Sequence, residues 1–208
     1  MVQADDNNKM IDLTKHFKIW FSKTKDIWMP LVNQQRLKRH KEKNPSHTLY
    51  LVGADRLLSE NQKQERIRFC KENKILYLDI DVEIPGMIAS LLDEHKRKID
   101  GILLQRANDQ IDAYFHVNRK NSCEKGNLGS ASDVLRWASI LLSNVGIYSD
   151  LDTEIDFREV TAQSIDKAFL IPCKKKFEGL MINNNFIASG QQSELANKNY
   201  NNQTLRFY

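Results

Sequence analysis

Two aspartates separated by a single residue, Asp150 and Asp152, end a short apolar run that is typical of a strand. In an extended chain their carboxylates point to opposite sides, so one reaches a cation directly and the other through a turn or a water molecule. Hard oxygen ligands select Mg²⁺ or Mn²⁺ over zinc. A cation held there would neutralise charge on phosphate groups of a substrate and polarise the bond that breaks. We therefore predict a metal site at Asp150 and Asp152.

The spacing of two aspartates carries little weight when taken alone. The chain has sixteen aspartates among 208 residues, and chance then gives ~1 such triplet. A second triplet, Asp79-Ile-Asp81, does occur. No capped helix precedes it, and we interpret its aspartates as polar residues at the end of a sheet strand.

A capped helix is predicted just before the first triplet. Ser130, followed three positions later by Asp133, resembles a capping arrangement, and an apolar stripe continues to Asn144. Gly146 supplies the left-handed stop before the strand. Asp133 and Arg136 lie three residues apart on one face of this helix. They are either a surface pair worth about 0.2–0.5 kcal/mol or the border of a ligand site.

The rest of the chain must supply the sheet and helices that position these residues. Apolar and aromatic runs predict strands at residues 16–21, 48–52, 75–79, 147–152, 169–172 and 186–189. Amphipathic segments predict helices at residues 31–43, 60–72, 86–98 and 130–144. Residues 102–104 are a short strand or helix, and residues 118–127 are a loop. This alternation predicts an α/β layer with a mostly parallel sheet.

Composition limits the class of protein. With 208 residues, 41% hydrophobic and 28% charged, we expect one globular domain. No window approaches the roughly 18 consecutive apolar residues of a spanning helix, and residues 1–9 do not resemble a signal peptide. The three cysteines are widely spaced, so we expect free thiols rather than disulfides or zinc ligands. The basic run 36–43 is interpreted as a solvated helix face, because no stacking aromatics accompany it, and no nucleic-acid partner is expected.

The sequence resembles the glycosyltransferases whose sugar-binding region contains a DXD motif, especially the large clostridial glucosylating toxins and related bacterial effectors. The resemblance rests on Ser132-Asp133-Val-Leu-Arg136 followed by Val145-Gly146-Ile-Tyr148-Ser-Asp150-Leu-Asp152. In that family the helix reads Ser-Asp-x-Leu-Arg and the strand Gly-Gly-x-Tyr-x-Asp-x-Asp, in the same order and spacing. The run 16–21, His-Phe-Lys-Ile-Trp-Phe, is similar to the opening strand of the family, and Asn44-Pro45 to the turn that follows. Val145 and Ser149 depart from the pattern, where a glycine and an apolar residue are usual.

The resemblance implies a GT-A type α/β fold, possibly truncated or minimal, that transfers a sugar from a nucleotide-sugar to an acceptor hydroxyl with retention of configuration. A UDP-sugar is the favoured donor, the acceptor is a protein or a glycan, and Mn²⁺ or Mg²⁺ is the cofactor. The metal ligands implied are Asp150 and Asp152. The donor-binding residues implied are Trp20, Asp133, Arg136, Tyr148, Asn184 and Asn185. Trp20 would stack on the nucleotide base, although an aromatic core strand explains it equally well.

Several alternatives stay open at the level of sequence. No acid/base residue is nominated, although His16, His116 and Glu154 are available. The chain is a fragment, a minimal enzyme, or a catalytically inactive interaction module. A metal-dependent nucleotidyl or phosphoryl transferase would also use paired aspartates, but no Gly-rich phosphate loop is present. We expect a glycosyltransferase domain at residues 10–190 between a flexible N-terminus (1–9) and a polar tail (191–208). Its expected location is the cytoplasm, or a host cell reached without a cleaved signal peptide.

Overall fold

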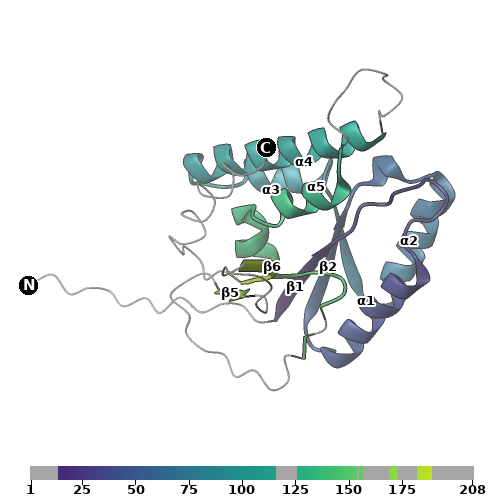
Figure 1. Ribbon diagram of the computed structural model, residues 1–208. Helices are drawn as coiled ribbons and strands as arrows, with labels where there is room; N and C mark the ends of the chain where they lie inside the picture. The colour runs from purple at the N-terminus through teal and green to yellow at the C-terminus, as the bar shows by residue number, and fades with distance from the viewer. Residues whose placement is uncertain (1–13, 116–125, 154, 157–168, 173–181, 189–208) are drawn as a thin grey trace, which may run out of the picture.

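A six-stranded sheet forms the centre of the molecule (Figure 1). The computed structural model describes residues 14–115, 126–153, 155–156, 169–172 and 182–188. The strands are β1 (Lys15–Ile19), β2 (Thr48–Gly53), β3 (Ile75–Asp79), β4 (Ile147–Ser149), β5 (Phe169–Pro172) and β6 (Ile182–Ala188). Their order in the sheet is β3-β2-β1-β4-β6-β5. Strand β1 therefore lies beside β4, which follows it by more than a hundred residues.

Four neighbouring strands of this sheet are parallel. Strand β1 pairs in parallel with both β2 and β4, and β2 pairs in parallel with β3. Strands β6 and β5 extend the sheet beyond β4 with antiparallel pairing. The predicted α/β fold with a mostly parallel sheet is confirmed. Because parallel strands end at the same edge, the residues that follow β1 and β4 are brought together there.

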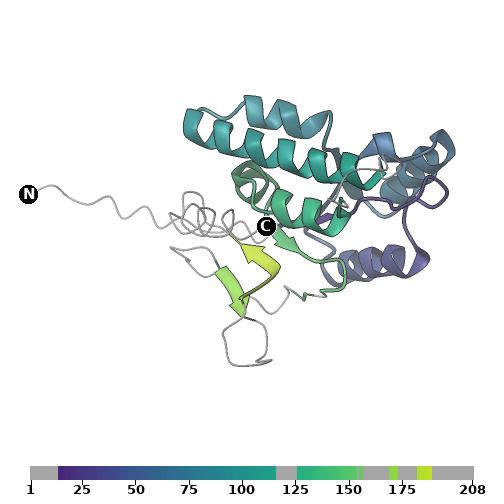
Figure 2. The ribbon, with the colours of Figure 1, turned by 45° about the horizontal axis from the view of Figure 1, so that its top comes forward.

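Helices cover both faces of the sheet (Figures 1 and 2). Helices α1 (Leu31–Lys43) and α2 (Glu60–Glu72) lie on one face, and α3 (Glu83–Ala89), α4 (Glu94–Phe115) and α5 (Leu128–Leu135) on the other. The alternation of side chains along β2 matches these two layers. Leu49 and Leu51 pack with α1 and α2, whereas Val52 packs with α3, α4 and α5. The predicted bounds of α1, α2 and β3 are confirmed.

Strand β1 departs from this apolar pattern on one face. Phe17 and Ile19 join the core under α3, α4 and α5. The alternate residues His16 and Lys18 are polar, yet their exposed fractions are 1% and 0%. His16 contacts His40 of α1, with 3.0 Å between its Nδ1 and the Nε2 of His40. The face of β1 toward α1 is therefore a buried polar layer.

The predicted helix at 86–98 is wrong in its bounds. Helix α3 ends at Ala89 and α4 begins at Glu94, so the region holds the end of one helix and the start of the next. The carboxylate of Asp93 accepts a hydrogen bond from the backbone N–H of Lys96 at 3.1 Å. This is the N-cap arrangement that starts a new helix. Residues 102–104 belong to α4, which resolves the choice between strand and helix.

The predicted helix at 130–144 is also wrong in its bounds and in its cap. Helix α5 covers Leu128–Leu135, and its N-cap is Asn127 rather than Ser130. The side-chain oxygen of Asn127 accepts hydrogen bonds from the N–H groups of Gly129 and Ser130, at 2.8 and 3.4 Å. Asparagine is as good a cap as serine, so the local pattern allowed either start.

A separate turn of π-helix, η2 (Leu141–Val145), follows α5 after a break. The carboxylate of Asp100, a residue of α4 with 1% exposure, accepts from the N–H groups of Ser139 and Ile140, both at 2.8 Å. Asp100 of α4 therefore caps the start of the helical segment that leads into η2. Gly146 then ends it with a φ of 109°, as the predicted glycine stop requires.

The remaining expectations about organisation have mixed outcomes. Strand β4 ends at Ser149, so Asp150 and Asp152 lie in the turn after it rather than in the strand. The segments expected to be a flexible N-terminus (1–9) and a polar tail (191–208) lie outside the described residues. Among the described helices, none is both long and apolar enough to cross a membrane. Cys70 is a buried free thiol, whereas the other two cysteines fall outside the described ranges.

Candidate functional site

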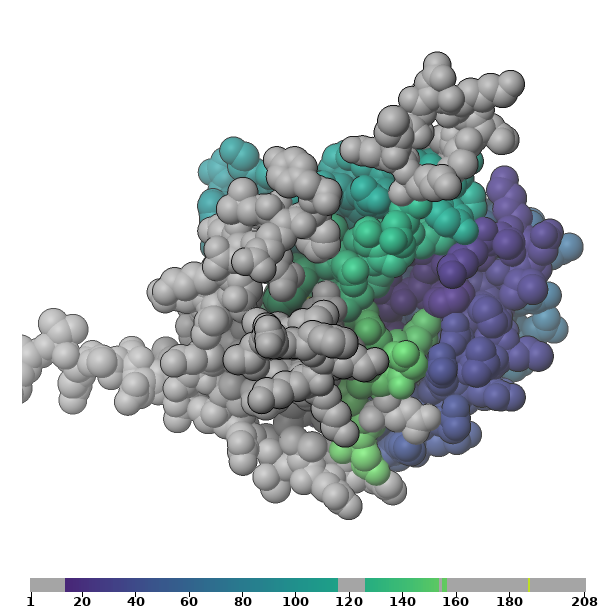
Figure 3. Space-filling view, viewed as in Figure 1, coloured from purple at the N-terminus to yellow at the C-terminus, as the bar shows by residue number. Residues whose placement is uncertain are grey.

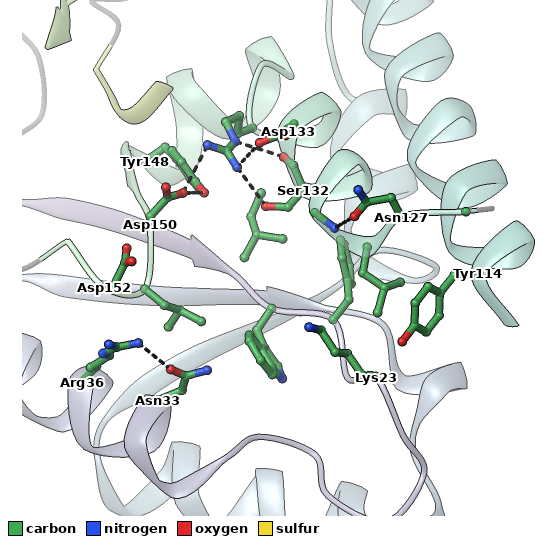
Figure 4. A pocket seen from close by; sticks show the side chains of 18 residues that line it. Lys23, Asn33, Arg36, Tyr114, Asn127, Ser132, Asp133, Tyr148, Asp150 and Asp152 are labelled. Carbon is green, nitrogen blue, oxygen red and sulfur yellow. Dashed lines mark hydrogen bonds and ion pairs between the residues drawn. The ribbon is translucent and has the colours of Figure 1, made fainter. Parts of the chain in front are cut away.

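A pocket of about 650 Å³ opens at the carboxyl edge of the parallel strands (Figure 4). Six residues predicted from the sequence line it, namely Trp20, Asp133, Arg136, Tyr148, Asp150 and Asp152. They come from the ends of β1 and β4 and from the segment around α5. Figure 3 shows one face on which the green surface of residues 126–153 meets the purple surface of the described residues that follow residue 13.

Arg136 connects the helix side of the pocket to the strand side. It follows α5 directly, and its exposed fraction is 5%. Its guanidinium lies 2.5 Å from the carboxylate of Asp133 and 3.2 Å from that of Asp150. The interpretation of Asp133 and Arg136 as a surface pair is therefore wrong, because the arginine is buried and shared with a second carboxylate. A buried guanidinium presents a fixed fork of donors toward anionic groups.

Tyr148 lies beneath this ion pair. The side chain is 1% exposed, its ring packs against Phe17, and the guanidinium of Arg136 lies 4.5 Å from the ring centroid. Its hydroxyl donates a hydrogen bond to the Oδ1 atom of Asp150. Burial raises the pKa of Tyr148, and the negative charge of Asp150 acts in the same direction. The hydroxyl therefore stays protonated at neutral pH and orients the carboxylate.

Asp150 and Asp152 lie at the mouth of the pocket, in the turn that follows β4. Among the described residues, no group of three or more His, Cys, Asp or Glu side chains is arranged to hold a metal. Two hard carboxylates at a pocket mouth fit a Mg²⁺ or Mn²⁺ that completes its coordination with substrate phosphates and water. The donor set thus fits a shared metal site rather than an all-protein cage.

Trp20 follows β1 directly and lines the pocket. Its indole N–H donates to the backbone carbonyl of Trp28 at 2.7 Å. This hydrogen bond fixes the orientation of the ring in the wall. Stacking of Trp20 on a nucleotide base stays a prediction.

Several residues that the sequence did not predict also line the pocket, among them Lys23, Asn33 and Arg36. Lys23 comes from the loop after β1, and Asn33 and Arg36 from the first turns of α1. Arg36 donates to the side-chain oxygen of Asn33 at 3.0 Å. The interpretation of the run 36–43 as a solvated helix face does not describe Arg36, which is half-buried and lines the pocket. The sequence feature that could have indicated these two residues is an asparagine followed by an arginine three residues later, at the start of a helix.

The sequence profile of glycosyltransferase family 88 matches residues 1–171. The chain belongs to glycosyltransferase family 88. The resemblance to glycosyltransferases of the toxin type is thereby confirmed. A comparison with curated protein sequences gives no match.

Solved structures support the fold of this family 88 chain. PaToxG glycosyltransferase is similar with a TM-score of 0.60 and 17% sequence identity, over 96% of this chain and 64% of that one. A transferase carrying two cysteine-to-serine substitutions is similar with a TM-score of 0.51 and 13% identity, over 91% of this chain and 78% of that one. The chain thus spans less than two thirds of the length of PaToxG. At these identities the likeness establishes the GT-A-like fold alone.

Two further predicted donor residues of the family 88 chain, Asn184 and Asn185, lie in β6. This strand pairs with β4, so that Tyr148 is opposite Ile187. The asparagine side chains are outside the description of the structure, and their role stays a prediction.

Of the three candidate acid/base residues, His16 alone lies in the described part of the chain. His16 is buried against α1 on the face of the sheet away from Tyr148, and it does not line the pocket. His116 and Glu154 lie outside the described residues. No catalytic residue is assigned among them.

The second aspartate triplet has a structural role at the end of β3. The carboxylate of Asp79 accepts from the N–H groups of Asp55 and Asp81, at 2.8 and 2.7 Å. Asp81 pairs with Arg56. Neither aspartate of this triplet lines the pocket. This agrees with the interpretation of Asp79 and Asp81 as polar residues that end a strand.

Proposed function

We propose that this chain is a metal-dependent glycosyltransferase that moves a sugar from a nucleotide-sugar, with a UDP-sugar favoured, to an acceptor hydroxyl. The observation that carries the proposal is the shared contact of Arg136. In a member of glycosyltransferase family 88, this one buried cation joins Asp133 beside the helix to Asp150 after the strand. It stands in a pocket whose volume of about 650 Å³ lies within the range of ligand sites, roughly 300–1,000 Å³.

The charges around the pocket suit a diphosphate. Three cationic residues, Lys23, Arg36 and Arg136, line it together with the two aspartates of the turn. Asp150 and Asp152 would hold Mn²⁺ or Mg²⁺, which neutralises charge on the diphosphate when bound. Arg136 would stabilise the same group from the helix side. These assignments follow the donor chemistry of carboxylates and guanidinium groups.

The other pocket residues would bind the rest of the donor. Asp133 presents a carboxylate that accepts hydrogen bonds from ribose or sugar hydroxyls. Trp20, with its ring fixed by the contact to Trp28, would stack on the base. Tyr148 would hold Asp150 in place through its hydroxyl. Asn184 and Asn185 are proposed at the sugar side.

We extend the proposal to the reaction and its setting. Transfer with retention, a protein or glycan acceptor, and action as a bacterial effector in a host cell all follow from the resemblance to the glucosylating toxins. A location in the cytoplasm of the producing cell is the alternative. The family assignment supports a sugar donor and an acceptor as the two substrate classes.

Donor hydrolysis tests the proposal. The chain is incubated with UDP- and GDP-sugars in the presence of Mn²⁺ or Mg²⁺, and release of the nucleotide is measured. We expect metal-dependent hydrolysis of one donor, and loss of it in Asp150→Asn with Asp152→Asn. Asp81→Asn, from the other triplet, is the matched control and keeps the activity. Hydrolysis that is unchanged in the double variant contradicts the proposal.

A catalytically inactive donor-binding module is the second candidate. The observation that favours it is that Arg136, Tyr148 and Asp150 build a binding site, whereas none of the described pocket residues is assigned as an acid or base. It predicts metal-dependent binding of UDP, seen as quenching of tryptophan fluorescence, without hydrolysis of any donor. Binding together with hydrolysis rules it out.

A further inference from the structure

A lysine lies fully buried in the middle of the parallel sheet. Lys18 belongs to β1, and its exposed fraction is 0%. Burial of an ammonium group is costly unless the group is hydrogen-bonded. Its neighbours in the strand, Phe17 and Ile19, pack into the apolar core on the opposite face. The sequence motifs used for the proposed function do not account for Lys18.

The contacts of Lys18 lead to the turn that carries the two aspartates. Its Nζ donates to the hydroxyl of Ser149 at 2.8 Å, to the backbone carbonyl of Asp150 at 2.7 Å and to that of Thr153 at 3.1 Å. These acceptors stand on both sides of Asp152. The turn is also closed by a backbone hydrogen bond from the N–H of Thr153 to the carbonyl of Asp150, at 3.0 Å. One buried cation thus joins the two ends of the turn.

We propose that Lys18 is a positioning residue that holds the turn of Asp150 and Asp152 in the geometry needed to bind a metal and a diphosphate. The inference rests on the proposed function, because it concerns the same pocket. Lys18 acts on the backbone of the turn and is not itself one of the residues that line the pocket. Hydrogen bonds from a charged donor are about twice as strong as neutral ones, and a water-poor surrounding strengthens them.

Pre-organisation is the physical reason for this role. Asp152 is exposed and lies in a turn after the last residue of β4. A carboxylate on an unsupported turn loses conformational freedom when it binds a cation, and this loss weakens binding. A turn already fixed at Asp150 and Thr153 has less freedom to lose. Lys18 therefore acts on the affinity for metal rather than on the chemical step.

Ser149 is the complementary part of this arrangement. The strand register places Phe17 opposite Tyr148, so Lys18 and Ser149 are the next residues of two adjacent parallel strands. Both are buried, with exposed fractions of 0% and 1%. The serine stands where the resembling glycosyltransferases usually have an apolar residue. Its hydroxyl supplies an acceptor for the ammonium, which explains why a polar residue occupies this buried position.

Binding of Mn²⁺ in the presence of UDP tests the inference without reliance on turnover. Free Mn²⁺ is measured by electron paramagnetic resonance as the full chain is titrated. Lys18→Met removes the ammonium and keeps most of the side-chain length. We expect the Kd for Mn²⁺ to rise about tenfold in Lys18→Met and about threefold in Ser149→Ala, while the number of sites per folded chain stays the same. A merely structural role would lower the number of sites and leave the Kd of the folded fraction unchanged.

Ser139→Ala is the matched control for Ser149→Ala. The hydroxyl of Ser139 also contacts a buried charged group, because it donates to the carboxylate of Asp100 at 2.9 Å, but Ser139 does not line the pocket. It is expected to leave the Kd for Mn²⁺ unchanged. If Lys18→Met does not fold, Ser149→Ala decides the question, because it keeps the ammonium and its two carbonyl contacts.

Amide hydrogen exchange of the turn separates the possible failures. The N–H of Thr153 is expected to exchange faster in Lys18→Met and in Ser149→Ala than in the parent chain. If the parent binds Mn²⁺ with UDP and both variants bind it equally well, the inference is overturned and the proposed function stands. If the parent does not bind them, the proposed function fails and the positioning role fails with it. Unchanged exchange at Thr153 shows that Lys18 does not fix the turn, and also overturns the inference.

Discussion

The guanidinium of Arg136 lies 3.2 Å from the carboxylate of Asp150. One residue follows a helix and the other follows a strand, so this contact joins the two halves of the sequence motif across the pocket. The same arginine holds Asp133 at 2.5 Å. A single substitution at Arg136 therefore disturbs both sides of the site.

Arg136→Lys is expected to lower kcat/KM for donor hydrolysis by about 10- to 100-fold, because one ammonium cannot replace a planar fork that reaches two carboxylates. Steady-state kinetics with the best donor measures the change. Arg56→Lys is the matched control, since Arg56 also contacts two carboxylates, those of Asp81 and Asp112, outside the pocket. Equal losses of kcat/KM in both variants would mean that the effect of Arg136→Lys is not specific to the site.

Tyr148→Phe removes the hydroxyl that donates to Asp150. We expect it to lower the free energy of unfolding by about 1 kcal/mol, the usual net value of one hydrogen bond, and to weaken Mn²⁺ binding in the presence of UDP. Urea unfolding and metal titration measure the two effects. Tyr77→Phe serves as the control, because Tyr77 also lies under an arginine, with the guanidinium of Arg66 3.8 Å from its ring centroid, but does not line the pocket. It should affect stability only, and an equal loss of metal binding there would refute the role of Tyr148.

Gly146→Ala is expected to destabilise the fold by about 2 kcal/mol or more, because the backbone conformation there is nearly restricted to glycine. The φ of Gly146 is 109°, and a Cβ would lie 2.1 Å from the carbonyl oxygen of Lys15. Gly101→Ala is the opposite case. Gly101 lies inside α4 with open space around a Cβ, so alanine should stabilise by about 0.5–1 kcal/mol. Thermal or urea unfolding measures both variants. If Gly146→Ala is as stable as Gly101→Ala or more stable, the requirement for glycine before β4 is contradicted.

The stability of the protein is expected to fall as the pH drops below 6.5. The pKa of His40 is lowered from its ordinary value of 6.5 to about 2, chiefly by burial, with the nearby cation Lys18 and then His16 and His47 acting in the same direction. At pH values between about 2 and 6.5, His40 binds a proton in the unfolded chain but not in the folded chain. The free energy of unfolding therefore decreases as the pH falls. Between pH 7.5 and pH 5.5 this group contributes a loss of about 1.4 kcal/mol.

Urea unfolding at these two pH values, with His40→Gln as the test variant, measures the contribution of His40. The difference in unfolding free energy between the two pH values should shrink in His40→Gln. His95→Gln, which replaces an exposed histidine of α4, should keep the difference of the parent. If His40→Gln retains the full difference, other groups carry the pH dependence.

Local pattern was sufficient for some of the regular elements and for naming six residues that line the pocket. Helices α1 and α2 and strand β3 have the bounds that the sequence predicted, because their apolar periods and flanking residues act within a few positions of the chain. Element ends that depend on partners elsewhere were misplaced. The break between α5 and η2 is an example, since it is capped by Asp100 of α4.

The sequence by itself determined the α/β class, the likeness to sugar-transferring enzymes and the identity of Asp133, Arg136, Tyr148, Asp150 and Asp152 as site candidates, because these features lie within short stretches of chain. Only the tertiary structure decided which distant residues complete the site. Strand β1 is inserted between β2 and β4, and this non-local pairing brings Lys18 beneath the turn and Arg36 to the pocket wall. Side-chain periodicity gives the face of a strand but not its neighbour in the sheet, so such contacts arise only when the chain is folded.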